Sequence, residues 1–239
     1  MRRLIVALLL LGFSPLLQAG AQQYEPLSAS VRAALSGAIA DKKPPGSSFK
    51  DYAEALAWLS VMSERLSRRV PDQAYRLELL RAIHYEATRA GLDPQLVLGL
   101  IQVESGFRKY AVSTADARGY MQVMPFWIKV IGQPGDNLFH LRTNLRYGCT
   151  ILRHYLTIEK GDLFRALGRY NGSLGYAEYP NLVKAAWEQW RLAPDSASTP
   201  APNSAPEVGN PGSGARNPEP ANSPMARRVL LNTRIAPTP

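Results

Sequence analysis

The stretch from residue 97 to residue 125, VLGLIQVESGFRKYAVSTADARGYMQVMP, constrains the fold of this chain more than any other. Its first part has the spacing of one helical stripe, i, i+3, i+4 and i+7. The residues on this stripe are Val97, Leu100, Ile101 and Glu104. Three are aliphatic and the fourth is a carboxylate, which is costly to bury without a partner. A Ser-Gly pair follows at once, so we expect Glu104 at the carboxyl-terminal end of a largely buried helix.

The expected position of Glu104 predicts an unusual carboxyl group. Burial disfavours the ionised form, and the negative end of the helix dipole does the same. Both effects raise the pKa of the carboxyl group, which is what a general acid working near neutral pH requires. The alternative is a frayed last turn from which Glu104 points to water, and this stretch alone leaves both interpretations open.

Helical periodicity and capping residues recur along the chain, and no run of alternating apolar and polar residues indicates a sheet. Asp93 and Pro94 open the helix described above, as an N-cap followed by proline at the first helical position. Gly91 is placed to end the preceding helix. We therefore expect an all-α, mainly helical fold. Helices are predicted near residues 31–39, 51–69, 73–90, 94–104, 119–124, 143–158 and 162–170, with a last one ending near Arg191.

The two ends of the chain differ in composition from its middle. Residues 1–21 combine an Arg-Arg pair, an apolar run and Ala-Gly-Ala, as a secretory signal peptide does. Cleavage after Ala21 would give a periplasmic or secreted protein without a transmembrane anchor; an uncleaved anchor is disfavoured because the apolar run is short. Residues 193–239 are rich in Pro, Ser, Ala, Gly and Asn and are expected to be a disordered tail. Between them we expect a helical extension at 22–76 and a larger domain at 77–192.

Charge and metal-ligating residues narrow the chemistry only partly. The net charge of +9 suits an anionic partner such as nucleic acid, phospholipid headgroups or a cell-wall polymer, but general solubility explains it equally well. The single cysteine, Cys149, permits no intramolecular disulfide and is expected to be a small buried residue. His84, His140 and His154 lack the spacing of a ligand set, so no metal or other cofactor is expected.

Four blocks of the sequence together resemble the SLT-type lytic transglycosylases. The central block, ESGFRKYAVSTADARGYMQVMP at 104–125, carries Glu-Ser, an aromatic residue, Ala-x-Ser and Gly-x-Met-Gln-x-x-Pro. Leu-Asp-Pro and an aliphatic helix precede it, and Asn144 with Gly148 and then RYNGS at 169–173 follow. The resemblance covers roughly residues 77–190. It implies a lysozyme-like, mainly helical fold that cleaves the glycan strands of peptidoglycan.

The resemblance also implies roles for individual residues. Glu104 matches the family's single catalytic acid, which protonates the glycosidic oxygen between N-acetylmuramic acid and N-acetylglucosamine and then acts as a base. The substrate's N-acetyl group assists, and the muramyl 6-hydroxyl attacks C1 to give a 1,6-anhydro product without water. Plain core packing is the alternative for Met121, and turn formation is the alternative for Asn171. The residues expected to contact the substrate are Ser113, Met121, Gln122, Tyr170 and Asn171.

Three features depart from the family pattern. Tyr120 replaces an aliphatic residue, and Asp116 replaces glycine. Arg169 and Ser173 replace the small residues around Tyr-Asn. These departures leave open whether glycan strands are cut at their ends or in the middle.

Two other functions remain compatible with the sequence. One is a muramidase of the same fold, with Asp116 supplying a second carboxylate. The other is a wall-binding scaffold with a degenerate site. The expected partner in each case is the peptidoglycan glycan strand, with the tail available to an envelope protein. Nucleic acid is not an expected partner.

Overall fold

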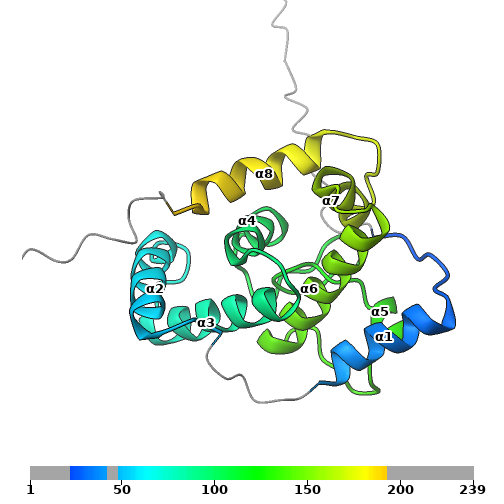
Figure 1. Cartoon of the computed structure of the whole chain (residues 1–239), viewed down its shortest axis with the longest axis horizontal. Coiled ribbons are helices and arrows are strands. Elements are labelled where there is room, and N and C mark those ends of the chain that lie inside the picture. Colours follow the sequence, from blue (N-terminus) through cyan, green and yellow to red (C-terminus); the bar gives the residue numbers. More distant parts are fainter. Residues whose placement is uncertain (1–21, 42–47, 193–239) are drawn as a thin grey trace, which may run out of the picture. The chain divides into compact units, whose positions relative to one another are not determined.

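The computed structural model describes residues 22–41 and 48–192, and these form helices joined by loops (Figure 1). The predicted signal peptide and tail lie outside the described residues. Only isolated β-bridges occur within the described part of the chain, so the expected all-α class is confirmed. No helix in that part is long and apolar enough to cross a membrane. The helices are α1 (Ala29–Ala40), α2 (Tyr52–Leu66), α3 (Gln73–Arg89), α4 (Pro94–Glu104), α5 (Phe126–Ile131), α6 (Leu141–Ile158), α7 (Leu163–Asn171) and α8 (Glu178–Trp190).

Short polar side chains and one glycine set the ends of the helices around α4. The Asp72 carboxylate accepts a hydrogen bond from the Tyr75 backbone N–H at 2.7 Å and so caps α3. Asp93 caps α4 in the same way, at 2.8 Å from the Gln95 N–H. Gly91 has a φ of 67°, a left-handed conformation that favours glycine just past a helix. The capping signals in the sequence therefore predicted these boundaries correctly.

The stretch from Gly119 to Met124 is not the short helix that the sequence suggested. Arg118 instead forms antiparallel bridges to both Val112 and Val123, and turns connect them. Gly119 has a φ of 76° and Gln122 a φ of 47°, and neither value continues a right-handed helix. Apolar spacing over so short a segment could not reveal this conformation.

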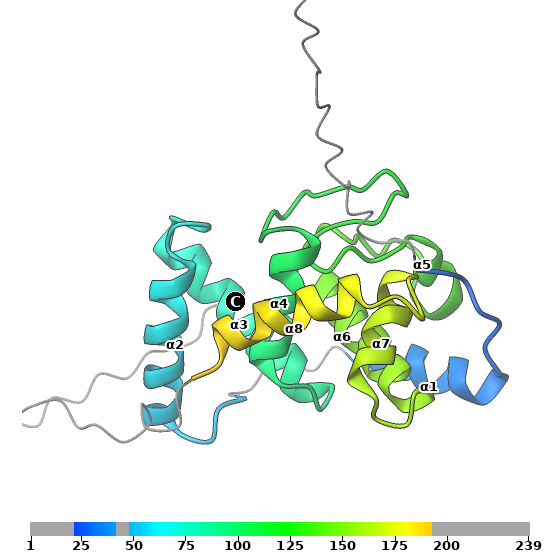
Figure 2. The ribbon, with the colours of Figure 1, turned by 90° about the horizontal axis from the view of Figure 1, so that it is seen from above.

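Helix α4 lies at the centre of the core and packs most extensively against α8 (Figure 2). All residues from Leu96 to Ile101 are buried, as expected for a helix that is covered on every side. Gly99 marks the place where the two helices come closest. A Cβ atom at Gly99 would lie 2.6 Å from the Trp187 backbone nitrogen, so only glycine permits this approach.

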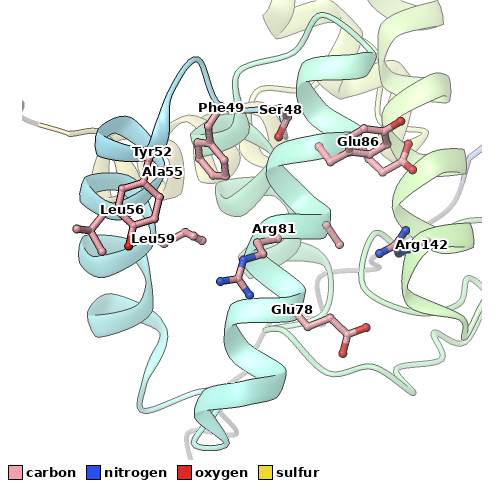
Figure 3. Close-up of a pocket in the computed structure, with 12 residues that line it drawn as sticks. Ser48, Phe49, Tyr52, Ala55, Leu56, Leu59, Glu78, Arg81, Glu86 and Arg142 are labelled. Carbon is pink, nitrogen blue, oxygen red and sulfur yellow. The ribbon is translucent and has the colours of Figure 1, made fainter. Parts of the chain in front are cut away.

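The two amino-terminal helices pack on different parts of the domain (Figures 1 and 2). Helix α1 contacts α5 and α6, whereas α2 contacts α3. A cavity of about 540 Å³ lies between α2, α3 and the start of α6 (Figure 3). The expected extension at 22–76 therefore contributes both packing and a concave surface.

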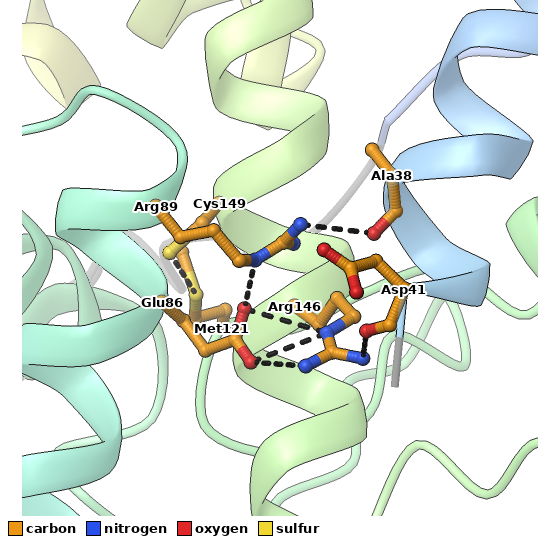
Figure 4. Close-up of polar contacts among 7 residues, drawn as sticks. All are labelled: Ala38, Asp41, Glu86, Arg89, Met121, Arg146 and Cys149. Atoms are coloured by element: carbon orange, nitrogen blue, oxygen red, sulfur yellow. Dashed lines mark hydrogen bonds and ion pairs between the residues drawn. The ribbon is translucent and has the colours of Figure 1, made fainter. Parts of the chain in front are cut away.

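A buried carboxylate joins α1, α3 and α6 (Figure 4). Glu86 is 1% exposed and accepts hydrogen bonds from Arg89 Nε at 2.9 Å and Arg146 Nη2 at 2.8 Å. The same two guanidinium groups donate to backbone carbonyls at the end of α1. Arg89 reaches the Ala38 carbonyl at 3.0 Å, and Arg146 reaches the Asp41 carbonyl. Because the carbonyl end of a helix is partly negative, these cations hold α1 in place while Glu86 compensates their charge.

Candidate active site

Glu104 is the last residue of α4 and its side chain is buried, with 5% of the residue exposed. The prediction of a buried acid is therefore confirmed, and the frayed alternative is wrong. The helix end is fixed by Ser105, whose Oγ donates to the Tyr120 carbonyl at 2.8 Å. Glu104 Oε1 accepts a hydrogen bond from the Tyr179 hydroxyl. Glu104 Oε2 is buried without a partner among the described residues, so it is the oxygen available to a ligand.

The environment of Glu104 favours the protonated carboxyl group. Burial raises its pKa to about 8, and the hydrogen bond from Tyr179 partly opposes this shift. The pKa values of two nearby tyrosines are shifted as well. Burial first, and the Glu104 carboxylate second, raise the pKa values of Tyr170 and Tyr179 well above their usual range. At neutral pH the site therefore holds one carboxylic acid and two neutral phenols.

The turn that carries Met121 is fixed by side chains from α6 and α7. Asn144 Oδ1 accepts from the Met121 backbone N–H at 2.8 Å, while Asn144 Nδ2 donates at 2.8 Å to the carbonyls of Arg118 and Leu138. The Tyr170 hydroxyl donates to the Met121 carbonyl at 2.7 Å. Tyr170 therefore stabilises the backbone of the turn at Met121, and it also lies close enough to Glu104 for the two groups to interact electrostatically.

The packing of Met121 explains a glycine in α6. The Met121 side chain is completely buried. A Cβ atom at Gly148 would lie 2.3 Å from its sulfur, so the absence of a side chain there makes room for Met121. Cys149 Sγ lies 4.0 Å from the same sulfur and is itself buried, as predicted for a small core residue. Met121 therefore packs as a core residue on the side of the turn that faces α6.

The polar residues predicted in the loop mainly stabilise its own backbone. Gln122 is 2% exposed, and its Nε2 donates to the Ala111 carbonyl at 3.1 Å and the Gly119 carbonyl at 2.9 Å. Ser113 Oγ accepts from the backbone N–H groups of Ala115 and Ala117. Their contact with substrate stays a prediction, but both residues already shape the loop between 111 and 122.

Asn171 is buried at the carboxyl-terminal end of α7. Gly172 follows it with a φ of 83°, which ends the helix in the left-handed conformation. This placement agrees with the alternative of turn formation, and a role in substrate binding stays a prediction.

Tyr179 is the site residue that the sequence did not reveal. Among the described side chains, Tyr179 is the one that is hydrogen-bonded to the acid. No local pattern connects it with Glu104, because the two residues meet only through the packing of α8 on α4.

Asp116 is held on the exposed surface of the loop. Both of its carboxylate oxygens accept from the Arg118 guanidinium at 3.0 Å, and its side chain is 55% exposed. Its φ of 66° accounts for the departure from glycine, since Asp tolerates the left-handed region better than most residues. This pairing does not favour Asp116 as a second carboxylate beside Glu104.

Two of the other departures, Tyr120 and Arg169, also have side-chain partners. The Tyr120 hydroxyl lies 2.6 Å from the Tyr75 hydroxyl, within hydrogen-bonding distance. Arg169 forms ion pairs with Glu159 and with Glu25 of the amino-terminal segment. These residues therefore link the domain to α3 and to residues that precede α1. No cluster of His, Cys, Asp and Glu within residues 22–41 and 48–192 could hold a metal ion.

Part of the chain is similar to known transglycosylases. Residues 81–182 match the family described as Transglycosylase SLT domain. The chain is 38% identical to a protein named membrane-bound lytic murein transglycosylase C from Histophilus somni, over 40% of this chain and 31% of that protein. It is 50% identical to a protein of the same name from Haemophilus influenzae, over 40% of this chain and 31% of that protein. A protein named transglycosylase from the phage PRD1 is 32% identical over 46% of this chain and 40% of its own length.

The matched region spans about a third of the two bacterial relatives. It contains Glu104, the turn at Met121, Asn144, Tyr170 and Tyr179. The site described above therefore lies entirely within residues 81–182, the region that matches the Transglycosylase SLT domain family.

Proposed function

We propose that this protein cleaves the β-1,4 bond between N-acetylmuramic acid and N-acetylglucosamine in peptidoglycan without water, leaving 1,6-anhydromuramyl ends. The observation that carries this proposal is the environment of Glu104. Its carboxyl group is buried, has a pKa raised to about 8 and accepts a hydrogen bond only from Tyr179 among the described residues. A protonated acid of this kind can give its proton to a leaving oxygen at neutral pH.

The proposed reaction uses Glu104 twice. The protonated carboxyl group donates its proton to the glycosidic oxygen as the bond from C1 to that oxygen breaks, and the substrate's N-acetyl group assists at C1. The Glu104 carboxylate then takes the proton of the muramyl 6-hydroxyl, whose oxygen forms the new bond to C1. This returns Glu104 to its protonated state and requires no second carboxylate. The ion pair between Asp116 and Arg118 agrees with this scheme, because it holds the nearest downstream acid in the loop away from a role as a second carboxylate.

The other residues would hold the sugar and the acid in place. Tyr179 orients the Glu104 carboxyl group, and Tyr170 fixes the turn at Met121. Gln122, Ser113 and Asn171 would line the position of the muramyl residue and its N-acetyl group, whereas the buried Met121 would support the turn from the core side. The substrate lies in the cell envelope, which agrees with the predicted signal peptide.

The products of sacculus digestion test the reaction type. Purified sacculi incubated with the protein are expected to release muropeptides that are each lighter by one water than the hydrolysis products, and mass spectrometry distinguishes the two. Reducing muramyl ends would instead show a muramidase. Binding to sacculi without any soluble product would show a scaffold, and either result overturns the proposal.

The pH dependence of the reaction tests the role of Tyr179. Activity is expected to fall as pH rises through about 8, because Glu104 then loses the proton it must donate. In a Tyr179→Phe variant the ionised carboxylate loses its hydrogen bond, so the pKa of Glu104 rises and the alkaline limb moves to higher pH. Initial rates of muropeptide release across the alkaline range measure this shift, and carbon NMR of the labelled carboxyl group measures the pKa itself.

Tyr176→Phe is the matched control for this experiment, since Tyr176 is 68% exposed on the preceding loop. Its profile should coincide with that of the unaltered protein. A Tyr179→Phe profile whose alkaline limb stays in place or moves to lower pH would contradict the assigned role of the hydroxyl.

A further inference from the structure

A cavity lies between α2, α3 and the start of α6 (Figure 3), and Glu104 is not among the residues that line it. None of the residues assigned to the proposed reaction lines it. One wall comes from α2, which lies outside the region matched by the family. Its volume, about 540 Å³, is that of a pocket for a small ligand or a few amino acid residues.

The wall formed by α2 and the residues before it is largely apolar. Its members include Phe49, Tyr52, Leu56 and Leu59. Tyr52 is 81% exposed and Leu56 is 55% exposed, although large apolar side chains are usually buried. This wall therefore offers methyl and ring surface to a ligand with apolar side chains.

The opposite wall carries charges that have no partner within the described part of the chain. Arg81 and Glu78 lie on α3, and Arg142 lies at the start of α6. None of the three takes part in an ion pair among the described residues. Glu86 also lines the cavity, but its carboxylate is already bound by two guanidinium groups. Two cations and one anion thus remain for a ligand.

This pattern specifies the charge of the ligand. Each guanidinium group matches the geometry of a carboxylate, and Glu78 matches an ammonium group. The best fit is therefore a short peptide with two carboxylates, one amine and small apolar side chains. A phosphatidylglycerol headgroup would use the two cations but offers no cation to Glu78. A folded protein partner would require a larger surface than this cavity provides.

We propose that the cavity binds the stem peptide of peptidoglycan, at a site distinct from the one that cleaves the glycan. Stem peptides carry D-glutamate and diaminopimelate residues beside alanines, so they offer carboxylates to both cations, the diaminopimelyl amine to Glu78 and alanine methyl groups to the apolar wall. The choice of this peptide rests on the proposed function, whereas the ligand chemistry rests on the cavity. Peptide binding here would place one stem of the polymer beside α2 while the glycan meets Glu104.

Direct binding to the full protein tests this proposal. The probe is the free tetrapeptide L-Ala-γ-D-Glu-meso-diaminopimelyl-D-Ala, titrated by calorimetry and by NMR. It is expected to bind and to shift the resonances of Tyr52 and Leu56. The double variant Arg81→Gln/Arg142→Gln should weaken binding by about tenfold or more, because both charge-assisted contacts are lost. Leu56→Asp should also weaken it, by placing a negative charge on the apolar wall.

The control is Arg32→Gln/Arg153→Gln, which makes the same change in net charge at two exposed positions outside the cavity. Its affinity for the tetrapeptide should equal that of the unaltered protein. Equal loss in both double variants would show a non-specific charge effect and overturn the proposal. So would binding of phosphatidylglycerol vesicles through Arg81 and Arg142 without binding of the peptide. The free peptide contains no glycosidic bond, so its binding is measured independently of glycan cleavage. If the protein does not bind the peptide but still digests sacculi, the peptide site is overturned and the proposed cleavage reaction is not.

Discussion

Replacing Glu104 with glutamine is expected to reduce muropeptide release from sacculi by about 10²- to 10⁴-fold, the usual contribution of a general acid. The amide has nearly the same shape as the carboxyl group but cannot transfer an acidic proton. The Tyr179 hydroxyl can still donate to the amide oxygen, so the fold around α4 should persist. Chromatography of released muropeptides over a time course measures the effect.

The control for this variant is Glu188→Gln. Glu188 lies on α8, its side chain is 61% exposed, and it pairs only with Arg191 among the described residues. Its rate of release and its thermal unfolding midpoint should match those of the unaltered protein. If Glu104→Gln retains full activity while remaining folded, Glu104 is not the catalytic acid.

Replacing Glu86 with alanine is expected to lower the free energy of unfolding by about 3 kcal/mol, the lower end of the range for breaking a buried ion pair. The change removes the carboxylate that compensates Arg89 and Arg146 and leaves two largely buried cations (Figure 4). Their contacts with the end of α1 should weaken as well. Denaturant unfolding followed by circular dichroism measures the loss.

Glu188→Ala is the matched control for stability. It breaks an ion pair with the same i, i+3 spacing as the pair between Glu86 and Arg89, but both of its partners are exposed. Exposed pairs contribute about 0–1 kcal/mol, so this variant should remain close to the unaltered protein. Similar losses at both positions would contradict the role assigned to the buried carboxylate.

The sequence predicted those features that depend on local signals. Asp93 and Pro94 began α4 where expected, and Gly91 followed the end of α3. Each of these acts through its own backbone conformation or through a neighbouring N–H group, so a few residues of sequence contain the whole signal. The stripe that contains Glu104 lies on one helix, but by itself it allowed both a buried acid and a frayed last turn, and the structure shows the buried acid.

The features that the sequence missed depend on contacts between distant segments. Tyr179 reaches Glu104 only because α8 packs on α4. The turn from Gly119 to Met124 was wrongly predicted to be helical. Its conformation is set by hydrogen bonds to Asn144, which lies on another helix, and the local sequence does not contain this information. The partners of Glu86 likewise include a residue sixty positions away along the chain. Propensity and periodicity contain no information about such contacts until the topology is known.

The close approach of α4 and α8 at Gly99 has a consequence for how a glycan strand would enter the site. Glu104 follows Gly99 on α4, and Tyr179 precedes Trp187 on α8. The acid and the hydroxyl that is hydrogen-bonded to it are therefore carried by two helices that pack closely at Gly99. We therefore expect Glu104 to keep its position when a strand binds. In the proposed reaction, the glycan strand would then have to be positioned relative to Glu104.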